Sequence, residues 1–282
     1  MNASPGTTLD AQMLIAQRGA VLRQNRAPPP TSALPGGFAA RKRGQGQVIA
    51  DSRVFMPGDE MRYVDRGATA RTGTLHVRSF HEERDRVTFL VADFRPAMLW
   101  GLRRAFRSVA AAEALAWIGW QAVAVGGRVG LLAVTADRAV VVGTRGGTRG
   151  MLGVIGGLVR AHAHALAASS DDPPLDQALA GLRLIVPRGA DVVIASALDR
   201  PGDGFAAVIG NLAQRHNPRF LLIRDDVLRD LPPGHYPMCG PDGQRGVARA
   251  LPGADPDHIS GRPVWPVDAG QPTADAMARV GA

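Results

Sequence analysis

The stretch that decides the fold is Val87-Thr-Phe-Leu-Val-Ala-Asp93, a nearly continuous apolar run that ends in a carboxylate. A strand of a parallel sheet shows this pattern, because helices cover both of its faces. Similar runs occur at residues 190–196 and 219–223. We therefore expect these three segments to be strands of a mostly parallel sheet.

Helical segments alternate with these strands. We expect helices over residues 11–24, 99–125, 148–168, 175–184 and 204–215. Residues 128–134 and 138–142 flank a short turn and predict a hairpin. The sequence thus predicts an α/β fold with a doubly wound, mostly parallel sheet and one antiparallel edge hairpin.

Shifts in composition divide the 282-residue chain into four segments. Residues 1–35 are an N-terminal appendage that ends in a Pro-rich linker. Residues 36–84 are a small β-rich subdomain, and residues 85–230 are the α/β domain. Residues 231–282 are rich in Pro, Gly and Asp, and we expect this C-terminal extension either to wrap the surface or to be partly disordered.

The composition indicates a globular, cytoplasmic protein. Hydrophobic residues make up 45% of the chain and charged residues 21%, which permits a buried core. The single cysteine, Cys239, excludes an intramolecular disulfide, and no signal peptide or transmembrane segment is evident. Peripheral association with a membrane remains open.

The net charge of +8 raises weak nucleic-acid binding as an alternative function. The basic cluster Arg41-Lys42-Arg43 lacks the interleaved aromatic residues that stack on bases. We therefore expect no nucleic-acid partner, and either a solvated surface or a surface for an acidic partner.

Acidic residues follow the predicted strands, at the sheet edge where open α/β proteins carry their sites. They are Asp93, Asp199, Asp225 and Asp226. Carboxylates gathered there favour a hard cation such as Mg²⁺. A metal-assisted hydrolase is therefore the second alternative function.

This layout resembles the von Willebrand factor A fold, whose metal motif places Asp-x-Ser-x-Ser after the first strand. Here Arg95 and Ala97 stand where that motif has hydroxyl groups. Arg95 could neutralise Asp93 through a charge-assisted hydrogen bond and would repel a divalent ion. We predict that Arg95 replaces the metal and that no cofactor is bound, with Mg²⁺ as the alternative. The positions of this degenerate metal site are Asp93, Arg95, Ala97, Ser196 and Asp199.

Residues 51–83 carry many charges of both signs between predicted turns. Pro57-Gly58-Asp59 predicts a tight turn, Thr72-Gly73 predicts a second one, and the alternation from Leu75 onwards predicts a half-buried strand. Such charges form either a solvated surface with weak ion pairs or a specified network. The pattern leaves both interpretations open.

The same segment resembles the signature of the bacterial domain-of-unknown-function family 58. That signature reads Asp-x-Arg-x-Tyr-x-Pro-Gly-Asp-Asp-x-Arg-x-Ile-Asp-Trp, followed by Ala-Arg-x-Gly-x-Leu-x-Val-Lys and Glu-Glu. The matching residues, which we predict to form a binding surface, are Asp51, Arg53, Pro57, Gly58, Asp59, Arg62, Asp65, Arg71, Gly73, Glu82 and Glu83. Arg66 replaces the Trp of the signature, which marks a divergent member.

The resemblance implies a von Willebrand A-like domain with a small β-rich insert, and a role as an adaptor or chaperone partner of MoxR-type AAA+ ATPases. The chain has no Gly-x-Ser-x-Gly, His-Glu-x-x-His or complete P-loop motif. We therefore expect an adaptor, not an enzyme, that binds a MoxR-type ATPase, a client protein or both. The client, the pathway and the oligomeric state remain open.

Overall fold

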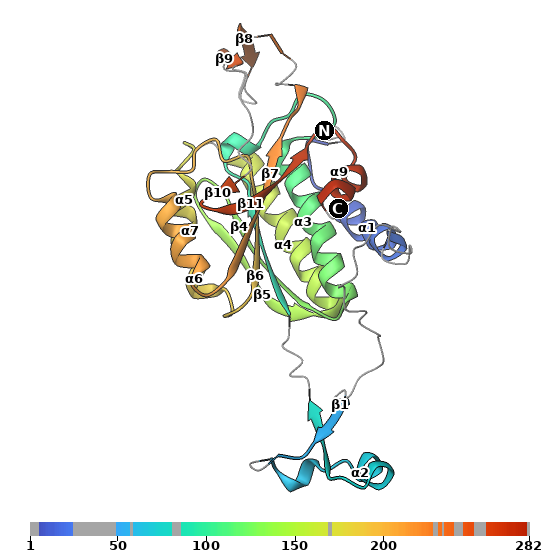
Figure 1. Cartoon of the computed structure of the whole chain (residues 1–282). Coiled ribbons are helices and arrows are strands. Elements are labelled where there is room, and N and C mark those ends of the chain that lie inside the picture. Colours follow the sequence, from blue (N-terminus) through green and yellow to red (C-terminus); the bar gives the residue numbers. More distant parts are fainter. Residues whose placement is uncertain are drawn as a thin grey trace. The chain divides into compact units, whose positions relative to one another are not determined.

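The computed structural model describes residues 6–24, 49–56, 59–80, 86–168, 171–227, 231–232, 234–239, 245–250 and 258–280. The chain forms two compact units (Figure 1). The main unit comprises residues 1–27 and 86–282, and the signature unit comprises residues 28–85.

The main unit is built on a seven-stranded sheet with the order β10-β11-β7-β6-β3-β4-β5. Its strands are β3 (Val87–Asp93), β4 (Arg128–Val134), β5 (Ala139–Gly146), β6 (Asp191–Ser196), β7 (Asn217–Arg224), β10 (His258–Ile259) and β11 (Arg262–Asp268). The two edge strands, β5 and β10, pair antiparallel, and the strands between them pair in parallel. The predicted α/β fold, with its mostly parallel sheet and antiparallel edge hairpin, is confirmed.

Helices cover both faces of this sheet (Figure 1). On one face lie α1 (Ala11–Gln24), α3 (Arg107–Ala124), α4 (Gly147–Ala167) and α9 (Thr273–Val280), and on the other lie α5 (Leu175–Leu179), α6 (Leu182–Ile185) and α7 (Phe205–Ala213). Successive strand side chains alternate between the faces. Leu90 of β3 therefore packs into one apolar core, while Phe89 and Val91 pack into the other.

Two segments that the sequence separates from the α/β domain belong to the main unit. The predicted N-terminal appendage contains α1, whose Leu14 and Val21 are buried in the core beside α3. The indole Nε1 of Trp120 also donates to the Leu14 carbonyl at 2.9 Å. The predicted C-terminal extension supplies β11, which adds a parallel strand next to β7, and α9. In both segments a few apolar residues gain enough burial to dock despite polar surroundings.

The predicted helix boundaries differ in two places. The helix expected from residue 99 begins at Arg107, because residues 99–106 form a compact loop. A Cβ atom on Gly101 would lie 2.1 Å from the Ala105 carbonyl oxygen, so this loop tolerates only glycine there. The helix expected over residues 175–184 is divided into α5 and α6 next to Gly181, since glycine weakens a helix. Among the described helices, none combines the length and apolar character that a membrane crossing requires.

The signature unit pairs β1 (Ile49–Val54) antiparallel with β2 (His76–Phe80). Between them lie a 3₁₀ helix, η1 (Met61–Tyr63), and α2 (Arg66–Thr72), which the β-rich expectation for this segment does not include. Asp65 caps α2 by accepting from the backbone N–H groups of Gly67 and Ala68 at 3.0 and 3.1 Å. Gly73, with φ of 71°, closes the helix where a turn is expected.

A further hairpin, β8 (Gly234–Cys239) with β9 (Arg245–Ala250), belongs to the main unit.

Candidate functional site

Asp93 ends β3 at the carboxyl edge of the sheet and forms a two-pronged ion pair with Arg95. Nε of Arg95 donates to Oδ1 at 2.9 Å, and Nη2 donates to Oδ2 at 2.8 Å. The backbone N–H of Arg95 also donates to Oδ1, so the chain turns tightly between the two residues. Both side chains are only 1% exposed. The ion pair suggested by the sequence is therefore present and shielded from water.

Other groups complete the shell of this pair. Nη1 of Arg95 donates to the carbonyl oxygens of Pro173 and Arg200. The hydroxyl of Ser196, at the end of β6, donates to Asp93 Oδ2 at 2.6 Å. Ser196 Oγ accepts in turn from the N–H of Leu198, which adopts a left-handed backbone with φ of 57°. Such a conformation costs a non-glycine residue about 1 kcal/mol or more, so the surrounding structure enforces this turn.

The residues at this edge do not fit a divalent cation. Both oxygens of Asp93 already accept from Arg95, whose guanidinium supplies the positive charge. Ala97, in the 3₁₀ helix η2 (Pro96–Met98), has no side-chain oxygen to offer. Within the part of the chain that the structure describes, no group of three or more His, Cys, Asp or Glu side chains could hold a metal ion.

Asp172 is a second carboxylate near Arg95 that the sequence does not single out. Its Oδ1 lies 3.9 Å from Arg95 Nη1 and makes no hydrogen bond. Burial raises the pKa of Asp172, and Asp93 raises it further, while Arg95 opposes this shift. The run of Asp and Pro around this residue gives no sign of which side chain faces the sheet.

The other predicted carboxylates have separate partners. Asp199 Oδ2 accepts from Arg107 Nη1 at 2.7 Å, and the Arg107 guanidinium lies 4.0 Å from the centre of the Trp100 ring. Burial lowers the pKa of Arg107, and Asp199 opposes that effect. Asp225 accepts from the backbone N–H of Leu102 at 2.7 Å. Each of these two carboxylates therefore accepts from a donor of its own.

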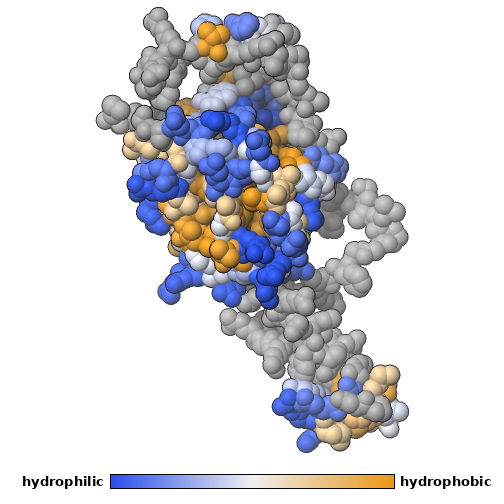
Figure 2. All heavy atoms as spheres, turned by 90° about the vertical axis from the view of Figure 1, so that its left-hand side faces the viewer, coloured by the Kyte–Doolittle hydropathy of each residue, from blue (hydrophilic) through white to orange (hydrophobic). Residues whose placement is uncertain are grey.

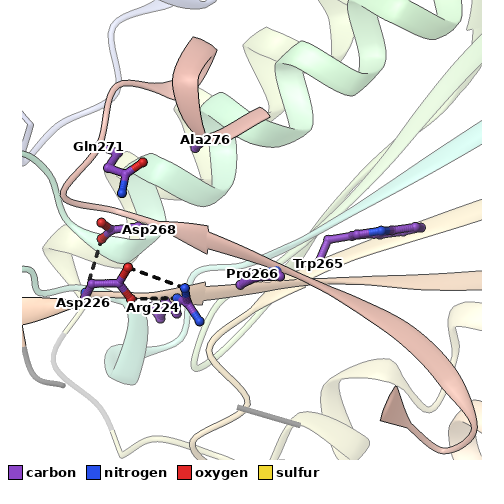
Figure 3. A pocket seen from close by; sticks show the side chains of 7 residues that line it. All are labelled: Arg224, Asp226, Trp265, Pro266, Asp268, Gln271 and Ala276. Atoms are coloured by element: carbon purple, nitrogen blue, oxygen red, sulfur yellow. Dashed lines mark hydrogen bonds and ion pairs between the residues drawn. The ribbon is translucent and has the colours of Figure 1, made fainter. Parts of the chain in front are cut away.

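Asp226 lines a small cavity at the ends of β7 and β11 (Figure 3). Arg224 Nε pairs with Asp226 Oδ1 at 2.7 Å, and the backbone N–H of Asp226 donates to Asp268 Oδ1 at 3.2 Å. The cavity has a volume of about 70 Å³. Sites for small molecules usually enclose about 300 Å³ or more, so this cavity suits water and not a substrate.

Three of the predicted signature residues form a turn or cap a helix in the signature unit. Asp59 Oδ2 accepts from the backbone N–H of Met56 at 2.8 Å, while Asp65 and Gly73 bound α2. Arg62, which pairs with Glu60, and Arg71 are exposed. Asp51 and Arg53 lie in β1, whereas Pro57, Gly58, Glu82 and Glu83 lie outside the described residues. Their role in binding stays a prediction.

Exposed apolar side chains of the signature unit are not evident from the sequence. Met56 and Met61 are 65% and 66% exposed, and Val54, Tyr63 and Leu75 are also exposed. Figure 2 shows hydrophobic side chains at the surface of this unit. The alternation after residue 75 identifies a buried strand face, but no local pattern indicates that the two methionines stay outside.

Comparisons with known proteins identify the family. The model of the family described as protein of unknown function DUF58 matches residues 51–247. Uncharacterized proteins of Mycobacterium bovis and Mycobacterium tuberculosis are 30% identical over 170 residues, which cover 60% of this chain and 48% of theirs, so the match spans about half of their length. The crystal structure of an aerotolerance-related membrane protein from Bacteroides fragilis, with multiple mutations to serines, aligns at 11% identity with a TM-score of 0.42 and covers 70% of this chain and 98% of that chain. From the family match over residues 51–247, this chain belongs to the DUF58 family.

Proposed function

We propose that this protein is a non-catalytic adaptor that binds a MoxR-type AAA+ ATPase, a client protein or both. The observation that carries the proposal is the exposure of Met56, Met61 and Tyr63 on the signature unit. Methionine and tyrosine are enriched at protein interfaces, and methionine adapts its shape to different partners. The family resemblance supplies the class of ATPase.

The exposed apolar side chains of the signature unit favour a partner that covers them. Ala68 and Val77 are buried, whereas the larger side chains of Met56 and Met61 are left in water. Burying Met56 and Met61 under a partner would contribute about 1–2 kcal/mol each.

The Asp93–Arg95 pair supports the non-catalytic part of the proposal. A carboxylate that acts as a base or holds a cation needs a free lone pair directed at the reacting group. Here both oxygens accept from a buried guanidinium. Separating such a pair costs several kcal/mol, so chemistry at Asp93 would begin with a large penalty.

Binding of the full chain to the MoxR-type ATPase of the same organism tests the proposal. Met56→Asp with Met61→Asp should abolish binding, because two charges would enter an apolar interface. The matched control is Leu152→Asp with Leu166→Asp, two exposed leucines of α4 in the main unit. Equal loss in both variants, or no loss in the methionine variant, would contradict the proposed contact surface.

A further inference from the structure

A row of arginines marks the amino end of the parallel strands in the main unit. An arginine lies at this end of each of the strands β3, β4, β5, β6, β7 and β11. Because β5 runs antiparallel to the others, its arginine lies near its last residue. In the order of these strands, the arginines are Arg86, Arg128, Arg145, Arg188, Arg215 and Arg262, which we call the arginine edge. Arg86, Arg145, Arg188 and Arg215 are exposed, and the other two are half-buried.

Backbone contacts link neighbouring segments of this row. The N–H of Arg128 donates to the Arg86 carbonyl at 2.8 Å, and Arg128 lies opposite Gly146, the residue after Arg145. The N–H of Gly189 donates to the Arg215 carbonyl at 2.9 Å, which joins the β6 and β7 loops. Neighbouring strands lie about 4.8 Å apart, so the row spans roughly 24 Å.

Among the residues that the structure describes next to these strand starts, one carboxylate accompanies the row. Asp191, the first residue of β6, is the carboxylate among the described strand starts, and it accepts from Asn217 and Arg219. Arg183 of α6 adds a further cation close by. Burial lowers the pKa of His216, and the positive charges of Arg215 and Arg183 lower it further.

Exposed aliphatic side chains flank the arginine edge on both faces of the sheet. Val125, directly after α3, is 66% exposed, and Leu184 of α6 is 83% exposed with Ile185 beside it. Helices α3 and α6 lie on opposite faces, so the row of charges runs between two aliphatic flanks. Figure 2 looks onto the α5–α7 side, where hydrophobic side chains lie between hydrophilic ones.

We propose that the arginine edge and its aliphatic flanks dock onto an anionic lipid bilayer. Arginine matches phosphate oxygens with its forked donors, and cations near an anionic membrane are attracted to its surface. Val125, Leu184 and Ile185 would enter the apolar boundary below the headgroups.

Nucleic acid, another polyanion, fits this surface less well than a bilayer. Nucleic acid would gain nothing from the aliphatic flanks. Residues 125–128, 183–189 and 214–217 also contain no Phe, Tyr or Trp on which a base could stack. An acidic protein surface would match the charges, and a comparison of vesicles with poly-glutamate separates it from a bilayer.

Co-sedimentation of the full chain with vesicles tests the proposal. The chain should bind vesicles of equal parts phosphatidylglycerol and phosphatidylcholine, and should not bind phosphatidylcholine alone. Each arginine near such a surface contributes a factor of about five, so Arg188→Glu with Arg215→Glu should weaken binding by about 25-fold or more. Leu184→Ser should also weaken it, and this exposed substitution leaves the core intact.

The matched control carries the same charge change at the opposite edge. Arg103→Glu with Arg138→Glu alters two exposed arginines near the carboxyl ends of the strands, beyond a Debye length from the bilayer, and should keep binding nearly unchanged. Equal weakening in this control would overturn the proposal. So would vesicle binding that ignores Arg188, Arg215 and Leu184, or binding of duplex DNA or poly-glutamate without binding to vesicles. Circular dichroism of each variant verifies its fold.

Discussion

Replacing Arg95 with methionine probes the buried ion pair at the carboxyl edge. Methionine fills part of the same volume but removes the charge. Asp93 would keep the Ser196 hydroxyl and a backbone N–H as donors, in a site that is only 1% exposed. The carbonyls of Pro173 and Arg200 would also lose a donor. Removing one member of a buried pair costs about 3–5 kcal/mol, and we expect a loss of this size.

A double-mutant cycle isolates the free energy of the Asp93–Arg95 interaction from that of the other groups around it. Asp93→Asn alone strands the buried guanidinium and should also cost about 3–5 kcal/mol. The double variant, Asp93→Asn with Arg95→Met, leaves no unpaired charge. Its cost should therefore fall short of the sum of the single costs by about 3 kcal/mol.

Urea unfolding followed by tryptophan fluorescence measures these losses. The four tryptophans, Trp100, Trp117, Trp120 and Trp265, all belong to the main unit, so the signal reports on the unit that contains the pair. Thermal melts should shift by about 6–20 °C for the single variants. A cost below about 1 kcal/mol for Arg95→Met, or additive costs in the cycle, would refute the assignment of a tightly coupled pair.

Three further predictions concern metal binding, pH and the signature unit. Titration calorimetry with Mg²⁺ or Mn²⁺ should show no micromolar binding, since Arg95 supplies the charge beside Asp93, and micromolar binding that Asp93→Ala removes would contradict this. Burial lowers the pKa of His162 from 6.5 to about 4. As the pH falls, the unfolded chain therefore binds a proton at this residue before the folded chain does. The free energy of unfolding should decrease by up to about 3 kcal/mol as the pH drops from 6.5 to about 4. His162→Gln should flatten that part of the urea profile, and an unchanged slope would exclude His162 as its source. Asp65→Ala should weaken α2 by about 1 kcal/mol and speed hydrogen exchange of its amides, whereas Asp65→Asn should retain the cap, and equal exchange in both variants would count against the cap.

The buried strands could be predicted from the sequence because each one is a short, continuous run of apolar residues. β3 is covered on both faces and must be apolar throughout, as residues 87–93 are. β11 escaped prediction because Pro263 and Pro266 interrupt it, and proline is rare within sheets. Its place beside β7 depends on a parallel pairing across a long connection, which no local pattern reveals.

The candidate site was only partly predictable for a related reason. Asp93 and Arg95 are two residues apart, so their contact follows from the turn after β3. The carbonyls of Pro173 and Arg200 come from distant loops. Every residue has a backbone carbonyl, so the residue types do not indicate which carbonyls accept from Arg95. Likewise, arginines near strand starts can be read from the sequence, but only the strand order aligns them in one row.

We propose that the protein acts through binding by its signature unit and not through chemistry at the carboxyl edge. The most direct measurement is the affinity of the full chain for its MoxR-type ATPase, determined by calorimetry with and without prior treatment of this chain with a metal chelator. Our account predicts that a chelator acting on this chain leaves the affinity unchanged and that Met56→Asp with Met61→Asp abolishes it. Affinity that depends on a metal at Asp93, or that survives the methionine substitutions, would contradict it.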